Sequence, residues 1–447
     1  MLKRRRNQSP ADRLDPDLDT PDSRSGGLAR GFVALQHRNY RLFFFGQLVS
    51  VTGTWMQSLA QSWLVVDTLK ASPIELGLVN VFQFGPVLLL GIPAGVLADK
   101  VPKRVLLIIS QTIFGLLALI LSALVATGRA ELWHVYLLAG LFGLTNAFDM
   151  PARQALISEL VDKSALMNAI ALNSAMFNTG RILGPAVAGV MLAAFGPAIC
   201  FAINGLSYIA VIIGLLMMRM EKVVKEVAGS AIEQLREGIR FVRNSPDIMR
   251  PVMMVGTVGT FGMAYNVWLP LLVTDSFKAD AETFGLLFSS MGAGSLLGAL
   301  SVAFFGKEPN RVRMLVAAMA LGTIIVSLGV VASIPLHVGF GMGLLAVSGF
   351  SASNTMAMAN TIVQTTAPDA LRGRVMAVYS TVFMGSAPIG ALIAGAVSQR
   401  YSVVVSMVIG GIIVFAVALS LFWLQTERRM AKTGAARGIP IDGGATP

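Results

Sequence analysis

Long apolar runs alternate with short polar segments along almost the whole chain. Several runs reach the roughly 20 residues that an α-helix needs to cross about 30 Å of hydrocarbon. Backbone groups in lipid must be satisfied within their own segment, and the runs are too long for the alternating strands of a membrane barrel, so we expect helices. The pattern predicts an all-α polytopic membrane protein with twelve transmembrane helices, near residues 41–67, 74–98, 104–127, 132–149, 167–194, 197–218, 250–274, 282–305, 313–333, 336–360, 373–397 and 402–424.

A polar interruption divides the predicted helices into two groups of six. Within it, Ile232, Leu235, Ile239 and Val242 recur at helical spacing opposite a charged side. This spacing predicts an amphipathic helix on the membrane surface, with a solvated linker as the alternative. We therefore predict five segments: a disordered basic and polar tail at 1–40, a six-helix half at 41–218, a linker at 219–249, a second six-helix half at 250–424 and a C-terminal tail at 425–447.

The sequence repeats itself weakly at a spacing of 208 residues, and a slightly smaller spacing of 203 aligns Pro185 with Pro388. Several matches in the same order predict two homologous halves. An even number of spans in each half keeps the halves in the same orientation, which is a parallel repeat around a central cavity. The matched pairs are Asp67 with Asp275, Lys70 with Lys278, Gly77 with Gly285, Lys103 with Arg311, and Asn146 with Asn354.

Composition and charge place the protein in a membrane and orient it. Charged residues make up 13% of the chain, against roughly a quarter in a soluble chain. Lysines and arginines concentrate in the loops on one side, together with both tails, whereas the opposite loops hold only Lys70, Arg129, Lys278 and Arg400. The positive-inside rule then predicts cytoplasmic termini in a cell (inner) membrane. This topology and attraction to membrane lipid explain the net charge of +11, so we expect no nucleic-acid partner.

Several kinds of site are missing from the sequence. The single cysteine, Cys200, excludes an intramolecular disulfide and a cysteine cluster for a metal, and the three histidines lie far apart. No phosphate-binding G-x-x-x-x-G-K-[ST] motif occurs, which argues against ATP as the energy source. No cluster of nucleophile, metal ligand and acid–base groups occurs either. The sequence therefore predicts a membrane transporter, expected to be a monomer, with no cofactor, no metal and no enzymatic activity.

The stretch GVLADKVPKR at 95–104 resembles the loop signature of the major facilitator superfamily. The stretches at 148–161 and 178–189 are similar to the branch that contains the enterobactin exporter and related drug and arabinose-type efflux permeases. The resemblance covers about residues 40–425 and implies a secondary transporter for small molecules. Residues that match the loop signature in place or in kind are Gly95, Leu97, Ala98, Asp99, Lys100, Lys103 and Arg104, while Pro102 replaces the usual glycine.

A second motif of the family gives a direction of transport. The fifth predicted helix is close to the Gly-x-x-x-Gly-Pro motif that the superfamily associates with exporters and antiporters, although small-residue packing alone also explains the glycines. Proton-coupled drug exporters of the family carry an arginine four residues before a glycine in the fourth helix, and here Ala139 precedes Gly143. The usual relay arginine is therefore missing, and the residue that carries a proton is unidentified. The residues of the fifth-helix motif are Gly180, Gly184, Pro185 and Gly189.

The loop signature predicts a conformational latch. Asp99 lies at a helix end, where it can meet the cation Arg153 or the positive N-terminus of the helix that begins near Arg372. Such contacts hold one side of the transporter closed and break when it opens. The alternative is that these charges only obey the positive-inside rule. The predicted latch consists of Gly95, Asp99, Lys100, Lys103, Arg104 and Arg153.

A polar stripe on the first predicted helix marks a candidate substrate site. Its six residues fall within an arc of about 100°, which predicts a face on the central cavity, with helix–helix hydrogen bonds as the alternative. The spacing of 208 carries Gln57 and Ser58 onto Tyr265 and Asn266, and these pairs are expected to face each other across the cleft. Asn146 and Asn354 form a second such pair. The stripe comprises Gln47, Ser50, Thr54, Gln57, Ser58 and Gln61.

Arg181 is a cation deep inside the fifth predicted span, about 21 Å from its start, and it shares a helix sector with Asn178. A charge at this depth is costly. It either attracts an anionic or polar cargo, couples to a proton-carrying group, or bonds to carbonyls or a buried acid. Asp67 and Asp275 near the outer ends of their spans, and Asp149 near an inner end, are candidate gate residues; Asp67 and Asp275 are equally well explained as loop acids.

Together these features predict alternating access, with export of drugs, secondary metabolites or a siderophore driven by the proton gradient. Two alternatives remain open: uptake of a small polar nutrient, and a non-transporting membrane sensor with the same fold.

Overall fold

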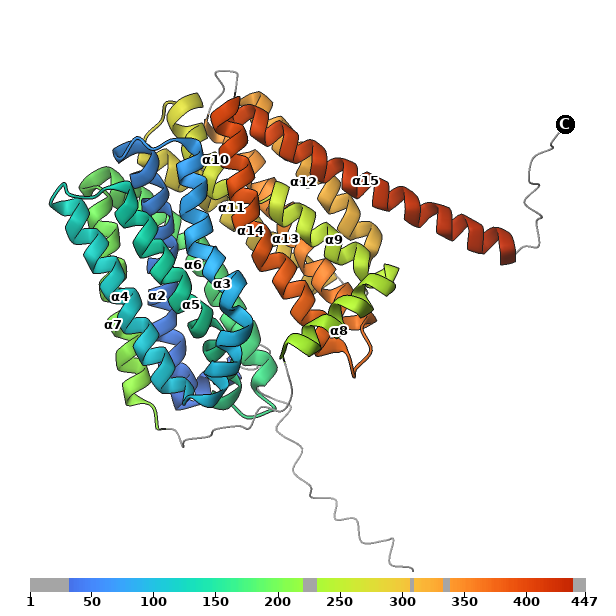
Figure 1. Cartoon of the computed structure of the whole chain (residues 1–447), viewed down its shortest axis with the longest axis horizontal. Helices are drawn as coiled ribbons and strands as arrows, with labels where there is room; N and C mark the ends of the chain where they lie inside the picture. The colour runs from blue at the N-terminus through green and yellow to red at the C-terminus, as the bar shows by residue number, and fades with distance from the viewer. Residues whose placement is uncertain (1–31, 220–230, 306–308, 333–337, 437–447) are drawn as a thin grey trace, which may run out of the picture.

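The computed structural model describes residues 32–219, 231–305, 309–332 and 338–436, and the helices in this part of the chain form two bundles side by side (Figure 1). The predicted all-α polytopic fold is confirmed. The N-terminal half consists of η2 (Val33–Gln36), α2 (Arg38–Trp63), η3 (Leu64–Thr68), α3 (Pro73–Lys100), α4 (Lys103–Ala126), α5 (Leu132–Leu160), α6 (Leu166–Phe195) and α7 (Pro197–Met217). The linker contains α8 (Ala231–Asn244), and the C-terminal half consists of α9 (Pro246–Phe261), α10 (Tyr265–Leu271), η4 (Leu272–Ser276), α11 (Ala281–Phe305), α12 (Arg311–Val331), α13 (Val338–Thr366), α14 (Arg372–Arg400) and α15 (Val403–Ala436).

Eight helical segments among the described residues are long and apolar enough to cross a membrane. The four other expected spans are α2, α5, α6 and α13, which have the length of a span but lower hydropathy. Each contains polar side chains, among them Gln57, Asn146, Arg181 and Asn354. These four helices therefore place polar groups at membrane depth, where such groups are costly unless they serve a cavity or a partner.

The seventh predicted span differs from the expected continuous helix. α9 ends at Phe261, and Gly262 closes it by donating its N–H to the Val258 carbonyl at 2.8 Å. The chain leaves the helix as far as Ala264, and α10 starts at Tyr265. Non-helical backbone at membrane depth is tolerated only where it is buried in protein or lines a water-filled cavity. We therefore expect the interruption in the first span of the C-terminal half to be buried in protein or to line a cavity.

The two halves repeat the same local irregularities at the predicted spacing of 208. The π-helical turn η3 after α2 corresponds to η4 after α10. The helix that follows each turn has a polar cap: Ser72 and Glu75 form a capping box on α3, and Asp280 accepts a hydrogen bond from the backbone N–H of Thr283 on α11 at 2.9 Å. The latter bond lowers the pKa of the Asp280 carboxyl. The parallel duplication predicted from the sequence is thus visible in the backbone.

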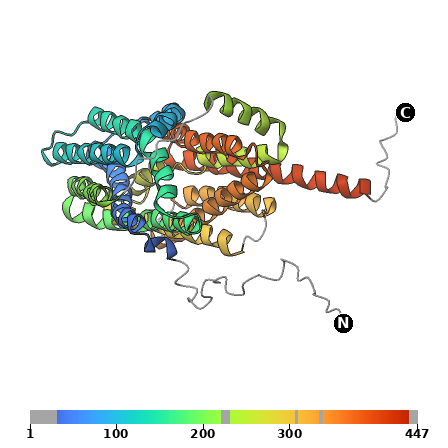
Figure 2. The same ribbon diagram turned by 90° about the horizontal axis from the view of Figure 1, so that it is seen from below.

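Two symmetry-related helix pairs join the halves: α3 packs against α14, and α6 against α11 (Figures 1 and 2). Small residues allow close approach in both pairs. A Cβ added at Gly77 would lie 2.7 Å from the Ala391 carbonyl oxygen, and one added at Gly285 would lie 2.7 Å from the Cα of Gly189. Gly77 and Gly285 are a pair predicted by the repeat, and they now occupy equivalent places in the interface. We call this end of the bundle, next to η3 and η4, the turn end.

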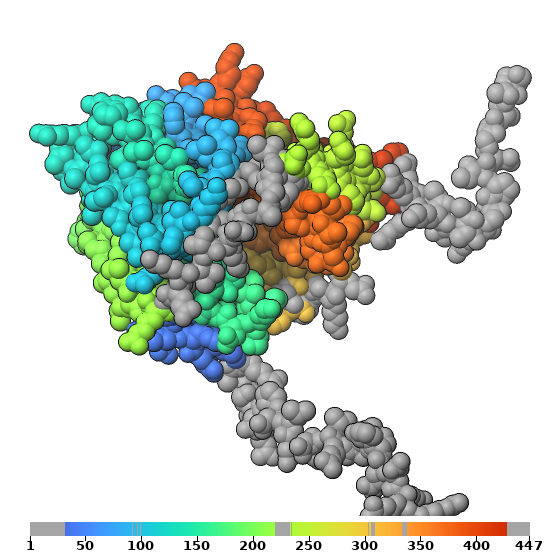
Figure 3. All heavy atoms as spheres, turned by 60° about the horizontal axis from the view of Figure 1, so that its bottom comes forward, coloured from blue at the N-terminus to red at the C-terminus, as the bar shows by residue number. Residues whose placement is uncertain are grey.

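At the other end, which we call the linker end because the linker leaves α7 there, the halves stand apart. Cβ atoms added at Gly91, Gly95 or Gly373 would meet no atom within 4 Å. Met167 and Phe304, near the linker-end termini of α6 and α11, are largely exposed. Figure 3 looks toward the linker end and shows the surface hollowed between the two halves. The structure is therefore closed at the turn end and open at the linker end.

The linker helix α8 packs on the protein as well as presenting an exposed side. Val242 is buried, and a Cβ added at Gly238 would lie 2.5 Å from the Arg374 carbonyl oxygen on α14. Glu237 and Arg374 form an ion pair at 2.5 Å. Ile239 remains exposed. A helix lies where the amphipathic helix was expected, and part of its apolar side covers the beginning of α14, while its place on the membrane surface stays a prediction.

Candidate functional site

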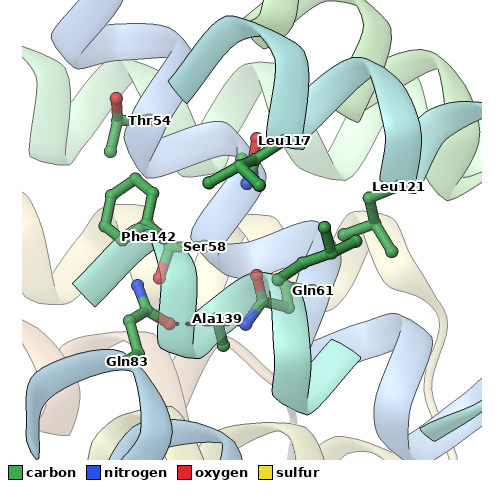
Figure 4. A pocket seen from close by; sticks show the side chains of 10 residues that line it. Thr54, Ser58, Gln61, Gln83, Leu117, Leu121, Ala139 and Phe142 are labelled. Atoms are coloured by element: carbon green, nitrogen blue, oxygen red, sulfur yellow. Dashed lines mark hydrogen bonds between the residues drawn. The ribbon is translucent and has the colours of Figure 1, made fainter. Parts of the chain in front are cut away.

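The polar stripe of α2 lines a small cavity inside the N-terminal half (Figure 4). The cavity measures about 20 Å³, which is room for one ordered water. Gln61 crosses it and donates to the Gln83 side chain on α3 at 3.3 Å. The cavity lining comprises Thr54, Gln57, Ser58 and Gln61 from α2, Gln83 from α3, Leu117 and Leu121 from α4, and Leu138, Ala139 and Phe142 from α5.

Other members of the stripe bond directly to α7. Gln57 accepts a hydrogen bond from Asn204 Nδ2 at 2.7 Å, and Thr54 lies 3.2 Å from the Tyr208 hydroxyl. Each of the two interpretations of the stripe therefore describes part of it. Some of its residues face a cavity, and others form hydrogen bonds between helices. The cavity is enclosed by helices of one half, whereas the expected location was the central cleft. Gln83 on α3 and Asn204 and Tyr208 on α7 were missed from sequence because one or two polar residues within an apolar run do not form a stripe.

The pseudo-symmetric counterpart of Gln57 lies inside the C-terminal half. Tyr265 is buried, hydrogen-bonds the Ser348 hydroxyl on α13 and makes an edge contact with Trp268, with ring centroids 5.6 Å apart. A buried tyrosine hydroxyl needs such a partner. Tyr265 therefore faces its own half, unlike the expected position across the cleft from Gln57. Asn266, the next residue, is half-buried.

Asn354 belongs to a buried polar network. Its Nδ2 donates to Ser301 Oγ at 2.7 Å, and its Oδ1 accepts from Arg313 Nε at 3.2 Å. Arg313 also donates to Ser301 at 2.9 Å, which closes a three-residue ring between α11, α12 and α13. Asn146, its counterpart on α5, is half-buried. The amide of Asn354 is thus engaged within its own half and not directed across the interface to Asn146.

A second buried network lies between α4 and α5. Asp149 is fully buried, accepts a hydrogen bond from Gln111 Nε2 at 2.8 Å and forms an ion pair with Arg153. Gln111 Oε1 and Arg153 Nε are buried without a hydrogen-bond partner among the described residues. Asp149 is also the only carboxylate that is buried in the described part of the chain. Asp149 and Arg153, predicted separately as gate and latch residues, therefore belong to one cluster that also contains Gln111.

The cations of the loop signature bind helix ends. Lys103 is buried and donates to the Ala98 carbonyl of α3 at 3.0 Å, while Arg104 donates to the Leu216 carbonyl of α7 at 2.8 Å. Cations suit these positions because a helix C-terminus carries partial negative charge. Lys100 is exposed. The backbone of Asp99 lies in α3, but its side chain is outside the described residues, so the Asp99 latch stays a prediction.

Arg181 lies on α6 at the boundary with α11. Its Nη2 donates to Asn178 Oδ1 at 2.8 Å, as their shared helix sector predicts, and its Nε is buried with no hydrogen-bond partner among the described residues. A Cβ added at Gly292 of α11 would lie 2.8 Å from the Arg181 carbonyl oxygen. No acid pairs with Arg181 among the described ion pairs. The residue is thus a half-buried cation with spare donor capacity at the seam between the halves.

The glycines of the fifth-helix motif provide close contacts with two neighbours. Cβ atoms at Gly180 and Gly184 would lie 2.7 and 2.5 Å from side-chain atoms of α2, and one at Gly189 would lie 3.0 Å from Gly285 Cα on α11. Pro185 is buried inside α6. This helix is therefore fitted tightly both to its own half and to the other half.

The two acids at the turn end are bonded locally. Asp67 forms an ion pair with Lys70 at 3.2 Å, and Asp275 accepts from the Thr274 hydroxyl at 3.0 Å. Both lie in the π-helical turns η3 and η4.

The fold, the polar side chains at membrane depth and the two-half interface define a polytopic membrane transporter. The chain matches the family model described as transmembrane secretion effector over residues 29–437. It belongs to this family, within the major facilitator superfamily.

Named relatives are efflux and siderophore transporters. The chain is 27% identical to the multidrug efflux pump Tap of Mycolicibacterium fortuitum, over 79% of this chain and 88% of the relative. It is 25% identical to the staphyloferrin A transporter of Staphylococcus aureus, over 89% and 99%, and 23% identical to the enterobactin exporter EntS of Escherichia coli, over 88% and 93%. The resemblance read from the loop and fifth-helix motifs is confirmed.

Solved structures share the fold. A bacterial homologue of the human lysosomal transporter Spinster, in an inward-facing conformation, matches with a TM-score of 0.68 at 13% identity, over 86% of this chain and 96% of that one. The nucleoside transporter NupG matches with a TM-score of 0.70 at 15% identity, over 87% and 99%. At these identities the likeness concerns the fold alone.

Proposed function

We propose that the protein exports a small organic molecule from the cytoplasm by alternating access. The observation that carries this proposal is the asymmetry of the interface: α3 with α14 and α6 with α11 are packed through small residues at the turn end and separated at the linker end. Tilting of the halves about these two symmetric seams would close one end as it opens the other. With both termini and the basic loops cytoplasmic, the state described here is the one that loads cargo.

The cargo class follows from Arg181 and from the relatives. A half-buried guanidinium with an unpartnered Nε has donors available for an anionic or polar group. Tap, the staphyloferrin A transporter and EntS are named for the transport of drugs and siderophores. Amphiphilic drugs, secondary metabolites and siderophores with acidic or catechol groups therefore form the candidate cargo.

The proton gradient is the proposed energy source, and Asp149 is the proposed proton-carrying group. It is the one carboxylate buried among the described residues, and it lies beside Arg153, whose charge it balances. Protonation of Asp149 would leave Arg153 without its counter-charge, so proton binding and a rearrangement near the linker end would be linked. Asp99 and the helix-end cations Lys103 and Arg104 would belong to the same gate.

Transport in membrane vesicles tests this proposal. Inverted vesicles from cells that overproduce the protein, energised with a proton gradient, should accumulate a fluorescent anionic amphiphile or a catecholate siderophore, and a protonophore should abolish the accumulation. The same assay is run on vesicles that contain the Asp149→Asn variant. Vesicles that contain Arg129→Gln, which removes a charge at the turn end, are the control. Uptake only in right-side-out vesicles would indicate an importer. Binding without flux in either orientation would indicate a sensor.

A further inference from the structure

An apolar groove runs along the outer face of the N-terminal half between α2 and α7, at the linker end. Its volume is about 500 Å³, within the range of roughly 300–1,000 Å³ typical of small-molecule pockets. Leu42 and Phe45 from α2 and Ile213 and Met217 from α7 form its walls, and Arg41 stands among them. No part of the central cleft or of the Gln61 cavity contributes to this groove.

Two glycines create the groove. A Cβ added at Gly46 would lie 3.0 Å from the Ala210 carbonyl oxygen, and one added at Gly214 would lie 2.9 Å from the Leu42 carbonyl oxygen. The backbones therefore touch at the floor, where neither helix has a side chain. The walls are long apolar side chains that stay about half exposed: Phe45 at 54% and Met217 at 50%. In a bilayer such a trough faces the acyl chains. The spacing of the apolar side chains that form its walls fixes how wide the trough is.

The linker-end mouth of the groove is positively charged. Arg38 donates to the Met217 carbonyl at 3.1 Å and Arg104 to the Leu216 carbonyl at 2.8 Å, so both guanidiniums are held at the end of α7. Arg41 is exposed, and its guanidinium makes no hydrogen bond or ion pair with another described residue. None of the ion pairs among the described residues joins an acid to Arg38, Arg41 or Arg104. An arginine with no partner among the described residues, next to an apolar trough, is complementary to a phosphate joined to a hydrocarbon chain.

We propose that this groove is a binding site for one anionic phospholipid. The phosphate binds Arg41, with Arg38 and Arg104 adding positive potential, and one acyl chain lies between Phe45 and Met217 over the two glycines. Anionic lipids concentrate in the leaflet that juxtamembrane basic residues face. The site relies on the proposed orientation of the linker end but not on transport, because it lies on the outside of one half. A bound lipid would brace the start of α2, the helix that carries Gln57 and Gln61.

Native mass spectrometry of the purified full-length protein tests the site with two probes, dioleoylphosphatidylglycerol and dioleoylphosphatidylcholine. We expect one phosphatidylglycerol to bind more tightly than phosphatidylcholine. Arg41→Gln should weaken phosphatidylglycerol binding by about tenfold, the loss of one charge-assisted contact to phosphate. The same charge removed at the turn end, Arg129→Gln, should leave the affinity unchanged.

A second variant tests the apolar part without changing charge. Ile213→Trp places a bulky ring in the trough at a half-exposed position and should reduce the occupancy of both lipids, whereas Arg41→Gln should reduce only that of phosphatidylglycerol. Equal binding of the two lipids to the wild type would overturn the proposal. So would equal losses in Arg41→Gln and Arg129→Gln, because they would indicate a general charge effect. Drug or siderophore flux plays no part in this readout, so failure of the export proposal would be seen separately.

Discussion

Lys70 and Lys278 lie 208 residues apart, and both adopt a positive φ, 50° and 46°. They are the only non-glycine residues with positive φ in the described part of the chain. Each follows a π-helical turn closed by an equivalent bond, Leu69 N–H to Leu64 O and Phe277 N–H to Leu272 O, both at 2.8 Å. The two halves thus share an energetically costly backbone conformation at equivalent positions. The duplication is therefore seen in the three-dimensional structure as well as in the sequence.

The first prediction concerns this turn. The left-handed conformation costs a residue with a side chain about 1–2 kcal/mol, and glycine adopts it freely. Lys278→Gly should therefore raise the melting temperature of the purified protein in detergent, by the equivalent of about 1 kcal/mol. Lys70→Gly should do the same, since its exposed ion pair with Asp67 contributes little. Lys100→Gly is the control, because Lys100 lies at the end of α3 and has no positive φ, and this variant should not stabilise the protein. If both turn variants melt at or below the wild-type temperature, the two turns are unstrained.

The second prediction concerns the closed seam at the turn end. A Cβ at Gly285 would lie 2.6 Å from the Pro185 carbonyl oxygen, so Gly285→Val should force α11 away from α6 and favour a state open at the turn end. Maleimide labelling of Ala281→Cys, in a background in which the buried Cys200 is replaced by alanine, reports this opening. We expect faster labelling in Gly285→Val.

Gly91→Val is the control for this seam, because a Cβ there meets no atom within 4 Å. It should label at the rate of the parent protein. Unchanged labelling in Gly285→Val would mean that this contact does not hold the turn end closed.

The third prediction concerns the buried pair Asp149 and Arg153. Asp149→Asn keeps a partner for Gln111 but leaves the Arg153 cation uncompensated, which costs about 3 kcal/mol in a buried environment. Removing both charges, in Asp149→Asn with Arg153→Gln, should restore more than half of the lost thermal stability. Both variants should fail to transport if Asp149 carries the proton. Melting curves for the double-mutant cycle measure the coupling, and strictly additive losses would refute it.

Much of the fold could be predicted from the sequence because hydrophobic length, loop charge and the repeat are each encoded locally or at a fixed spacing. The pairs Asp67 with Asp275 and Gly77 with Gly285 were found this way, and the structure places them at equivalent points. The break at Gly262 was not predicted, because Gly262 is one of three glycines in this apolar run and the hydropathy does not distinguish it from Gly256 and Gly259.

The candidate site was harder to predict. Helical periodicity shows which residues share one face of a helix, but it does not show which other helix packs against that face. The stripe of α2 was found, whereas its partners Gln83 and Asn204 on other helices were not. The repeat carried Gln57 onto Tyr265 correctly in register. It could not show that the broken helix turns Tyr265 toward Ser348.

The fourth prediction concerns cargo binding by Arg181. Arg181→Gln removes the cation while leaving a group that can bond Asn178, and we expect loss of transport of an anionic siderophore with normal insertion in the membrane. Arg181→Lys keeps the charge but not the planar fork, so it should retain part of the activity. Competition binding to the purified variants measures the effect. Equal affinity for the siderophore in wild type and Arg181→Gln would assign the residue to packing against α11.

The fifth prediction tests the central claim, that two homologous halves tilt about a shared interface, by pulsed electron spin resonance with two label pairs. Lys163→Cys with Ala370→Cys reports the distance between the halves at the linker end, and Arg129→Cys with Tyr401→Cys reports it at the turn end; all four positions are exposed. When cargo or a proton gradient is supplied, the linker-end distance should shorten while the turn-end distance lengthens. Distances that stay fixed at both ends, or that change in the same direction, would contradict alternating access in this protein.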